Sequence, residues 1–499
     1  MTDPAPIRFH KEEGRDLAGE KGNLVVFADA AGKLTPGAQA VDRLTGGALG
    51  RAVADPDFKA KPGTTRTLRY PSGVAAGAVI LATLGKDPDR AAARKTGGAI
   101  ARALVKGDVT LATAGVADDA LVAELAHALV LRLYDFRDYK TAQEENGPES
   151  TPPGKRKVHL LAADPRAARR AQARFAALAE GVFFTRDLVN EPANRLTTDA
   201  FAKRLEALGK LGVEVEVLGE AELEKLGARA LLAVGQGSDS ESRIVVMRWD
   251  GGRKKDAPLA LIGKGVVFDT GGISMKPASG MEEMTMDMGG AGVVSGVMRV
   301  LALRKAKANV VGVVGLVENM PDARAQRPGD IVRSMKGDTI EVINTDAEGR
   351  MVLADLLWYA QERFKPAAMV DLATLTGAMV IALGHHRAGF FATDDAFAAE
   401  YAAAAEATGD EIWRMPLGKP YAEQIKSRLA DIKNTGGRSA GAITAAEFLH
   451  RFVRDGVPWI HIDIAGVTLN SNGTDLAPKG ASGWGVAALD ELVRAKLEG

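Results

Sequence analysis

The chain of 499 residues contains no cysteine. Disulfide bonds and thiolate metal sites are therefore excluded, and the absence is compatible with a reducing cytoplasm. Only seven histidines are present, and no two of them are spaced as H-x-x-x-H. That spacing places two zinc ligands on one face of a helix, so a zinc helix of this kind is excluded as well.

Neither sign of charge is in excess, since 64 basic residues balance 64 acidic ones. The chain as a whole therefore has no net electrostatic field that would favour binding to nucleic acid or to an anionic membrane surface. No uninterrupted apolar run approaches the roughly 18 residues of a membrane span. The N-terminal stretch "MTDPAPIRFHKEEGR" also lacks the apolar segment of a signal peptide. We expect a cytoplasmic protein without a membrane or nucleic-acid partner.

The sequence does contain the alternation of elements that is typical of an α/β protein. Its length and its 46% hydrophobic content suffice for two or three domains with a large core. Short β runs such as "NLVVFAD", "AVILATLG" and "VHLLAAD" alternate with alanine-rich helical stretches in the first third of the chain. A polar stretch rich in proline and glycine, from Tyr139 to Lys157, predicts an exposed loop before the last strand of this first domain.

A long helical pattern begins at Arg166, and Pro192 prevents its continuation. We interpret this pattern as a connector between two domains. It predicts an N-terminal α/β domain at residues 1–165, a connecting helix at 166–192 and a second α/β domain at 193–499.

The second domain contains the apolar runs "VEVEVL", "APLALIG", "NVVGVVGLV", "AAMVDLATL" and "WIHIDIAG", which are separated by helical stretches long enough to be crossovers. They predict a mostly parallel sheet that is buried on both faces. Ligands of such sheets bind beyond the carboxyl ends of the strands, so the residues after these runs are the first candidates for a site.

Charged residues collect directly after one of these runs. The segment that follows "LALIG" offers Lys264, Asp269, Lys276 and Asp287 within 24 residues. The segment is also dense in glycine. Ordering glycine costs more conformational entropy than ordering other residues, so this density indicates a backbone that is held in a specific shape around a site.

A second group of charges lies in "INTDAEGRMVLADLL", where Asp346, Glu348 and Arg350 stand at the entrance to an apolar helical pattern. Two interpretations are open at this point. Thr345 and Glu348 match a capping box, in which a hydroxyl and a carboxylate satisfy free amides at a helix start. Alternatively, both acids belong to one site together with the first group of charges.

Four carboxylates in one cleft (Asp269, Asp287, Asp346 and Glu348) would repel one another unless cations neutralised them. Two divalent ions balance four negative charges. Pairs of such ions serve hydrolytic enzymes because they bind substrate, activate water and stabilise an oxyanion. Ligands that are mainly oxygen atoms favour harder ions, so Mn²⁺ and Mg²⁺ are candidates beside Zn²⁺.

Three motifs together carry a family resemblance: "NTDAEGR" at 344–350, "GKGVVFDTGGISMKP" at 263–277 and "MDMGGA" at 286–291. In this combination the chain resembles the leucyl (cytosol) aminopeptidase family. Weaker matches are "RDLVNEPAN", "ATLTGA", "DIKNTGGRSAGAITAAEFL" and "HIDIAG". The resemblance covers roughly residues 180–490, and the first 165 residues are consistent with the family's macro-like N-terminal domain.

The resemblance implies a dinuclear metal site. One metal ion would be held by Lys264, Asp269, Asp287 and Glu348, and the other by Asp269, Asp346 and Glu348, so that Asp269 and Glu348 bridge the two. Lys264 would bind as a neutral amine, which is plausible because a neighbouring cation lowers the pKa of a lysine.

The resemblance also assigns roles beside the metals. Lys276 would stay charged and face the scissile carbonyl, and Arg350 would hold a bicarbonate ion that acts as general base. Met284 would line the pocket for the substrate side chain, and backbone groups near Leu375 and Gly377 would align the peptide.

The implied function is a metal-dependent aminopeptidase that releases the N-terminal residue from peptides with a free N-terminus, with leucine-type or broad specificity. The implied assembly is a homohexamer. A DNA-binding or regulatory family member with secondary peptidase activity is the alternative, and the balanced charge argues against it.

Overall fold

The computed structural model describes residues 1–141 and 156–498. Residues 142–155, which form most of the loop predicted before the last strand of the first domain, lie outside the described part. The chain divides into two compact units. The smaller one comprises Met1–Phe183 with Ser471–Gly480, and the larger one comprises Phe184–Asn470 with Ala481–Gly499.

The smaller unit contains a six-stranded sheet. Its strands are β1 (Ile7–Lys11), β2 (Asn23–Phe27), β3 (Thr65–Arg69), β4 (Ala78–Ala82), β5 (Val109–Ala112) and β6 (Val158–Ala162). They lie in the order β1-β6-β5-β2-β4-β3, and only β3, at the edge, runs antiparallel to its neighbour. Strands β2 and β4 are buried along their whole length, as expected of apolar runs in a parallel sheet.

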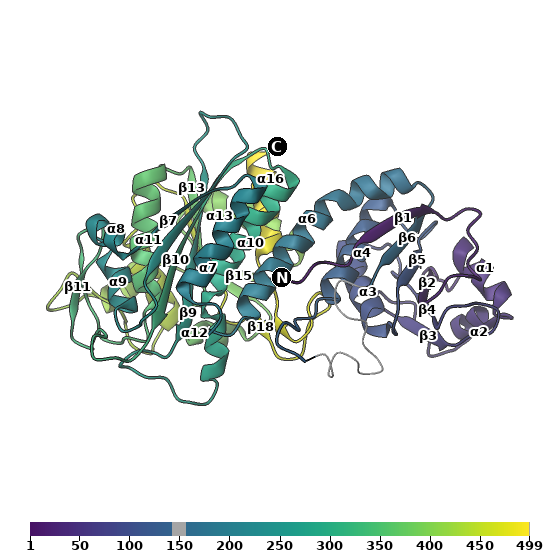
Figure 1. The fold of residues 1–499 in the computed structure, drawn as a ribbon, viewed down its shortest axis with the longest axis horizontal. Helices are drawn as coiled ribbons and strands as arrows, with labels where there is room; N and C mark the ends of the chain where they lie inside the picture. The colour runs from purple at the N-terminus through teal and green to yellow at the C-terminus, as the bar shows by residue number, and fades with distance from the viewer. Residues whose placement is uncertain (142–155, 499) are drawn as a thin grey trace. The chain divides into compact units, whose positions relative to one another are not determined.

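Helices cover both faces of this sheet. They are α1 (Pro36–Leu44), α2 (Ala48–Ala54), α3 (Arg90–Ala103) and α4 (Asp119–Arg132). Figure 1 shows α1 and α2 on one side of the sheet and α3 and α4 on the other. Val41 and Leu49 pack with Leu24, Val26 and Leu81 in one apolar cluster, which joins α1 and α2 to the sheet.

The larger unit contains an eight-stranded sheet. Its strands are β7 (Glu214–Leu218), β8 (Arg243–Asp250), β9 (Leu259–Asp269), β10 (Asn309–Asn319), β13 (Ala368–Ala373), β14 (Ala388–Ala392), β15 (Ile412–Arg414) and β17 (Trp459–Asp463). The order is β15-β14-β17-β13-β9-β10-β8-β7. The centre, β17-β13-β9-β10, is parallel, and antiparallel pairings appear only where β14 and β8 join it and between β8 and β7. The predicted α/β fold with a mostly parallel central sheet is therefore confirmed.

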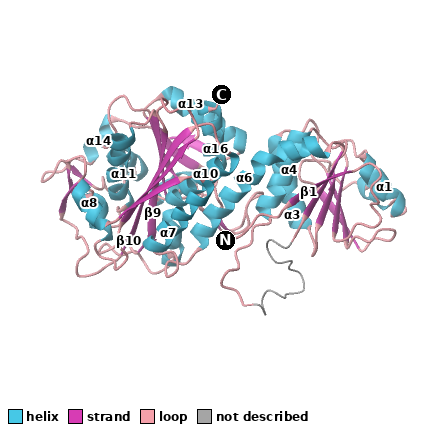
Figure 2. Ribbon diagram, turned by 45° about the horizontal axis from the view of Figure 1, so that its top comes forward, coloured by secondary structure: helices cyan, strands magenta, loops and turns pink. Residues whose placement is uncertain are grey.

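Helices lie on both faces of the larger sheet as well, as Figure 2 shows in cyan. On the side of α10, the helices of this unit include α7 (Thr198–Glu206), α10 (Gly289–Arg304), α13 (Asp395–Thr408) and α16 (Val486–Leu497). On the other side lie α8 (Glu220–Leu226), α9 (Arg229–Gly235), α11 (Gly349–Phe364) and α14 (Lys419–Gln424). Helix α15 (Gly441–His450) belongs to the same apolar cluster as α11. The remaining helical segments are η1 (Ala207–Leu211), η2 (Met281–Met288) and α12 (Gly377–Leu383). The described part also has two small sheets, made of β11 (Ile331–Arg333), β12 (Thr339–Glu341) and β16 (Ile432–Lys433), and of β18 (Leu469–Asn470) and β19 (Gly480–Ala481).

Helix α10 lies directly on the backbone of the sheet because glycine occupies the contact. A Cβ atom on Gly290 would lie 2.0 Å from the carbonyl oxygen of Leu372 in β13. A Cβ atom on Gly263 in β9 would lie 2.6 Å from the Cα atom of Ala291. Side chains at these two positions are therefore incompatible with the observed packing, and the start of α10 is fixed against β9 and β13.

Helix α6 (Pro165–Asn190) belongs in part to each compact unit. The division of the chain at residues 165 and 192 stays a prediction, and we propose on this basis that α6 is the connector. Among the described residues, one helical stretch, Met281–Arg304, is long and apolar enough to cross a membrane. Its most apolar window is 83% buried inside the protein, which is the environment of a core helix.

Asp355 joins three parts of the larger unit. It lies on α11 and is completely buried, and its carboxylate accepts hydrogen bonds from the amides of Leu231 in α9 (3.0 Å) and Met335 (2.7 Å). The Leu231 amide belongs to the first turn of α9, where the helix itself offers no acceptor. Burial raises the pKa of Asp355 to about 7, against the opposing effect of these hydrogen bonds.

We predict that Asp355→Asn changes how stability depends on pH. An unfolded aspartate has a pKa near 3.9, so the folded state holds the proton more tightly than the unfolded state. The stabilisation by this group is complete below about pH 4 and is lost as the pH rises through about 7. The wild type should lose on the order of 4 kcal/mol of unfolding free energy relative to Asp355→Asn across this window, at about 1.4 kcal/mol for each unit of the pKa shift.

Urea titrations followed by tryptophan fluorescence measure this difference, because all five tryptophans lie between residues 249 and 484 and belong to the larger unit. Parallel pH profiles of the two proteins would contradict the prediction.

Candidate metal centre

The ten residues predicted for the site surround one cavity of about 560 Å³ in the larger unit. They are Lys264, Asp269, Lys276, Met284, Asp287, Asp346, Glu348, Arg350, Leu375 and Gly377. Strand β9 carries the first two, η2 carries Met284 and Asp287, and the start of α11 follows Glu348. Leu375 and Gly377 follow β13, so the cavity lies where the central strands end.

Lys264 lies inside a strand, which differs from its predicted place after one. Strand β9 extends from Leu259 to Asp269 because the residues that follow Lys264 are also apolar and buried. The lysine is therefore rigidly held, with Gly315 of β10 beside it in the sheet. Asp269 is the residue that stands at the strand end.

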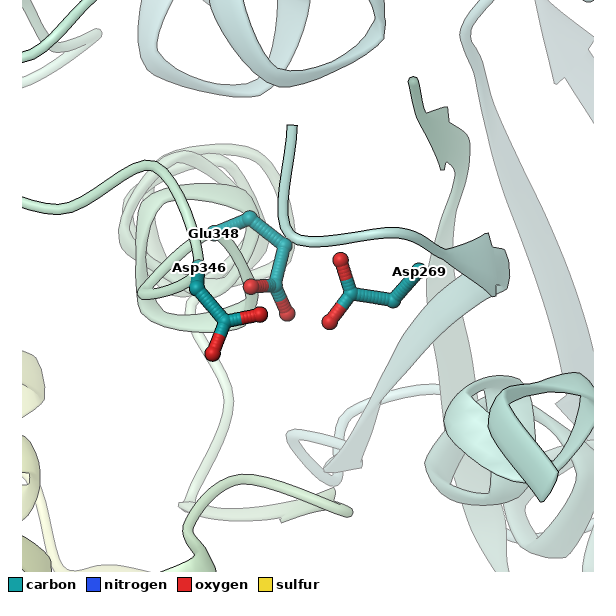
Figure 3. A group of neighbouring side chains, drawn as sticks. All are labelled: Asp269, Asp346 and Glu348. Carbon is teal, nitrogen blue, oxygen red and sulfur yellow. The ribbon is translucent and has the colours of Figure 1, made fainter. Parts of the chain in front are cut away.

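Three carboxylates converge in the cavity. Oxygen atoms of Asp269, Asp346 and Glu348 lie within 4.8 Å of one another, which is close enough to share a metal ion. Figure 3 shows these side chains turned toward one another, with Asp269 at the end of β9 and the other two on the segment that leads into α11. Asp269 and Glu348 are buried, and Asp346 is partly exposed.

Lys264 bridges two acids on the buried side of the site. Its Nζ atom lies 2.7 Å from Asp287 Oδ1 and 2.8 Å from Glu348 Oε1, and it donates to the carbonyl of Thr374 at 3.0 Å. Gly349 makes room for it, since a Cβ atom there would lie 2.7 Å from the lysine side chain. Burial alone would lower the pKa of Lys264, but the neighbouring carboxylates outweigh it and raise the pKa above its ordinary value.

Lys276 bridges the other pair of acids, on the more open side. Its Nζ atom lies 2.7 Å from Asp269 Oδ2 and also pairs with Asp346. Burial opposes the charge of Lys276, and the carboxylates again raise its pKa. The two ammonium groups offset half of the negative charge of the four acids.

The remaining negative charge perturbs the acids themselves. Burial, followed by repulsion from Glu348, raises the pKa of Asp269 to about 6. Burial also raises the pKa of Asp287 well above its ordinary value. Glu348 is as deeply buried, but Lys264 and Lys276 together lower its pKa. The raised pKa values of Asp269 and Asp287 indicate that additional positive charge would stabilise the ionised form of the site.

The capping-box interpretation of "TDAE" is wrong. The side chain of Glu348 makes no capping hydrogen bond at the start of α11 and binds Lys264 instead. The Thr345 hydroxyl donates to the carbonyl of Gly271 and accepts from the amide of Ser274 at 2.8 Å. Thr345 thus fixes the turn after β9 and leaves the acids free to face the cavity.

The residues present fit divalent cations. Asp287 Oδ2 and Glu348 Oε2 are buried oxygens that have no hydrogen-bond partner within the described ranges. Cavity-lining oxygens of this kind, with a lysine amine beside them and no histidine or cysteine, form a donor set for hard to borderline ions. Arg350 fits an anion, because its Nε atom is likewise buried without a described partner while its Nη1 atom donates to the carbonyl of Asn434 at 2.8 Å.

Four residues that support the site were missed by the sequence analysis. Asn319 donates to Asp269 at 2.8 Å, and the Thr374 hydroxyl donates to Asp287 Oδ1 at 2.7 Å. Asn434 holds the segment before Asp346 through the amide of Ile343, and Asp463 holds the segment after β13. Asn319 and Asp463 end strands and Thr374 follows one, so the position rule for parallel sheets could have found three of the four.

Comparison with known proteins gives consistent matches along the chain. The model of the cytosol aminopeptidase family, catalytic domain, matches residues 183–490, and the model of that family's N-terminal domain matches residues 25–143. A probable cytosol aminopeptidase of Cereibacter sphaeroides is 57% identical over 499 residues, with 100% of both chains covered. Another, of Dinoroseobacter shibae, is 57% identical over 502 residues with the same coverage.

Two solved structures are similar to the whole chain. The bottromycin maturation enzyme BotP in complex with Mn is 34% identical, with a TM-score of 0.81, and the match covers 95% of this chain and 99% of that one. A mutant of tomato leucine aminopeptidase is 29% identical, with a TM-score of 0.85, and the match covers 99% of this chain and 97% of that one.

We predict that Mn²⁺ binds more tightly as the pH rises. With the ligands that the family resemblance implies, binding would displace the proton of Lys264, and below about pH 6 it would also displace the proton of Asp269. For each proton released, the affinity should rise about tenfold per pH unit. Calorimetric titrations at pH 6, 7 and 8 in buffers of different ionisation enthalpy give both the affinity and the number of protons. An affinity that does not change with pH would contradict the prediction.

Proposed function

The chain belongs to the cytosol aminopeptidase family and is a metallopeptidase, and we propose that it releases the N-terminal residue from peptides through a dinuclear metal site. The observation that carries this proposal is the convergence of Asp269, Asp346 and Glu348 beside the Lys264–Asp287 pair. Four acids in a buried cavity need cations, and two lysines neutralise only part of their charge.

We assign Lys264, Asp269, Asp287 and Glu348 to one ion, and Asp269, Asp346 and Glu348 to the other. When bound, two divalent ions would supply an activated water and positive charge for the oxyanion. Mn²⁺ is a supported candidate because the similar BotP structure holds Mn, and the donor set also suits Zn²⁺ and Mg²⁺. For this role the Nζ atom of Lys264 must release its proton to solvent, so that its lone pair would be available to the ion that Asp287 and Glu348 would also hold.

Lys276 and Arg350 have separate tasks. Lys276 lies at the more open side of the cavity, with its side chain 20% exposed, where its ammonium can face the carbonyl of a bound peptide. It keeps its proton, because the adjacent carboxylates raise its pKa. Arg350 would hold bicarbonate through its unpaired Nε atom, and bicarbonate would accept the proton of the attacking water.

The substrate is a peptide with a free N-terminus. The carboxylate of Asp287 can receive the α-ammonium group, and this contact places the first carbonyl near Lys276. Backbone groups of Leu375 and Gly377 align the peptide, and Met284 lines the pocket for its first side chain. Thr468, beside the start of α10, is buried and smaller than the apolar residue expected there, which favours broad specificity over a strict leucine preference.

We further propose a homohexamer in the cytoplasm. Both proposals follow from the family and from the name that the relatives carry. The balanced net charge disfavours the alternative of a DNA-binding or regulatory member with secondary peptidase activity.

We predict opposite defects for the two lysines. Lys264→Ala should lose bound metal, because it removes a ligand and leaves Asp287 and Glu348 without their shared partner. Lys276→Ala should retain both ions and lose about 10²–10³ in kcat, the usual effect of deleting one preorganised oxyanion donor. Elemental analysis and steady-state kinetics on both variants test this assignment. Loss of metal from Lys276→Ala, together with full metal content in Lys264→Ala, would reverse the two roles.

We predict that acetylation of the substrate N-terminus strongly slows hydrolysis. The acetylated nitrogen is an uncharged amide, so it cannot form the charge-assisted hydrogen bond to Asp287, which is worth about 1.5–3 kcal/mol. The fall in kcat/KM should be about 10- to 150-fold, which chromatography of matched free and acetylated peptides measures. Equal cleavage of both peptides would contradict the exopeptidase proposal.

A further inference from the structure

Asp463 lies behind the wall of the cavity and has no role in the assignments above. It is the last residue of β17 and is 1% exposed. Strand β17 is parallel to β13, with Asp463 beside Ala373, so its carboxylate lies next to the segment that leaves β13. That segment, residues 374–377, lines the cavity, and Asp463 does not belong to the described lining.

The carboxylate of Asp463 fixes this segment at two points. Its Oδ1 atom accepts hydrogen bonds from the amides of Leu375 (3.1 Å) and Ala465 (3.2 Å), and its Oδ2 atom accepts one from the Thr376 hydroxyl (2.6 Å). The same hydroxyl accepts a hydrogen bond from the amide of Met379 at 3.1 Å and thereby caps the N-terminus of α12. One side chain therefore sets both the backbone at Leu375 and the start of α12 at Gly377.

These bonds determine which groups can face a peptide. The amide of Leu375 is occupied by Asp463, so any contact that the Leu375 backbone makes to a substrate must use its carbonyl. Gly377 is the first residue of α12, and its orientation follows from the cap that Thr376 provides. Removing the carboxylate of Asp463 would free the Leu375 amide and the Thr376 hydroxyl, and so release the two groups from their fixed direction.

Asp463 also links this wall to the anion-binding arginine. Burial lowers the pKa of Arg350 to about 10, and Glu348 and Asp463 are the acids that oppose this effect. His461 lies on the same face of β17 as Asp463, because the two residues are two positions apart in the strand. The His461 ring is held in turn, since its Nδ1 atom lies 2.6 Å from Asp371 Oδ1 in β13. Asp463 thus stands between a rigid buried network and the cavity.

We propose that Asp463 is a positioning residue of the peptidase, whose carboxylate holds residues 374–377 in the geometry that aligns the peptide and acts through Thr376 on α12. The inference rests on the aligning role proposed for Leu375 and Gly377. Asp463 does not touch the substrate, so its effect must pass through the segment that it binds.

The test compares Asp463→Asn, Thr376→Val and the double variant in the full-length, metal-loaded enzyme, with the dipeptide Leu-Gly as substrate. Misplacement of aligning groups by about 1 Å can cost 10²-fold in rate, so each single variant should lose about 10- to 100-fold in kcat/KM with unchanged metal content. The two residues share one hydrogen bond, and each also has a contact of its own, to the Leu375 amide and to the Met379 amide. The double variant should therefore lose clearly less than the product of the two single losses. A purely structural role would not produce this non-additivity in catalysis.

Asp355→Asn is the matched control. Asp355 is also a fully buried aspartate of the larger unit that accepts two backbone amides, but it does not line the cavity. It should lower the melting temperature while kcat/KM stays within about threefold of the wild type, because its contacts lie in the core. An equal fall in kcat/KM for Asp355→Asn and Asp463→Asn would overturn the inference.

If Asp463→Asn does not fold, comparison of Thr376→Ser with Thr376→Val tests the same hydrogen bond from the Thr376 side. Serine keeps the hydroxyl that Asp463 accepts, so it should lose clearly less activity than Thr376→Val, and equal losses would overturn the inference. Wild-type efficiency of Asp463→Asn with full metal content would overturn it as well. Activity of fully metal-free wild type would contradict the proposed function instead, so the two failures are distinguishable.

Discussion

The pairing of Lys264 with Asp287 and Glu348 is the constraint on which the rest of the site depends. A buried ammonium and buried carboxylates are each costly to remove from water, and removing one partner leaves the other uncompensated. The lysine comes from the middle of β9, and its partners come from η2 and from the segment before α11. Ion pairs therefore hold three separate segments of the chain together at Lys264. Any cation that binds must compete with the ammonium group of Lys264 for the same carboxylates.

The parallel sheet explains how so many polar groups reach that point. Strands β9, β10, β13 and β17 run in one direction, so Asp269, Asn319, the segment from Thr374 and Asp463 all emerge at the same edge. Two neighbouring pairs are joined across the edge: Asn319 donates to Asp269, and Asp463 accepts from the Leu375 amide. The core cluster beneath consists of apolar side chains, so the polar groups of the site collect at the edge, where they have one another as partners.

The sequence predicted the parts of this arrangement that leave a strong local pattern. Apolar runs revealed the central strands, and acids beside glycine-rich turns, together with the family resemblance, indicated the cavity residues. It missed β8 and β14, because "RIVVMRWD" is interrupted by charge and "AGFFA" is short. Glu348 matched a helix cap by spacing alone, and only the tertiary position of Lys264 decides against that interpretation. The strand-end rule could have pointed to Asn319, Thr374 and Asp463 one by one, but their hydrogen-bond partners could not be predicted, because these contacts depend on the order of the strands in the sheet.

The close approach of Gly290 and Gly263 has a mechanical consequence. Where a helix rests on a sheet through side chains, substitutions or warming can change the gap, because side chains repack. Here the peptide backbones of α10, β9 and β13 touch, so the gap is set by main-chain atoms that no substitution elsewhere removes. The spacing between Asp287 and Lys264 therefore behaves as a rigid dimension of the fold. Substitutions in the surrounding core can therefore lower the stability of the protein before they change the distance between Asp287 and Lys264.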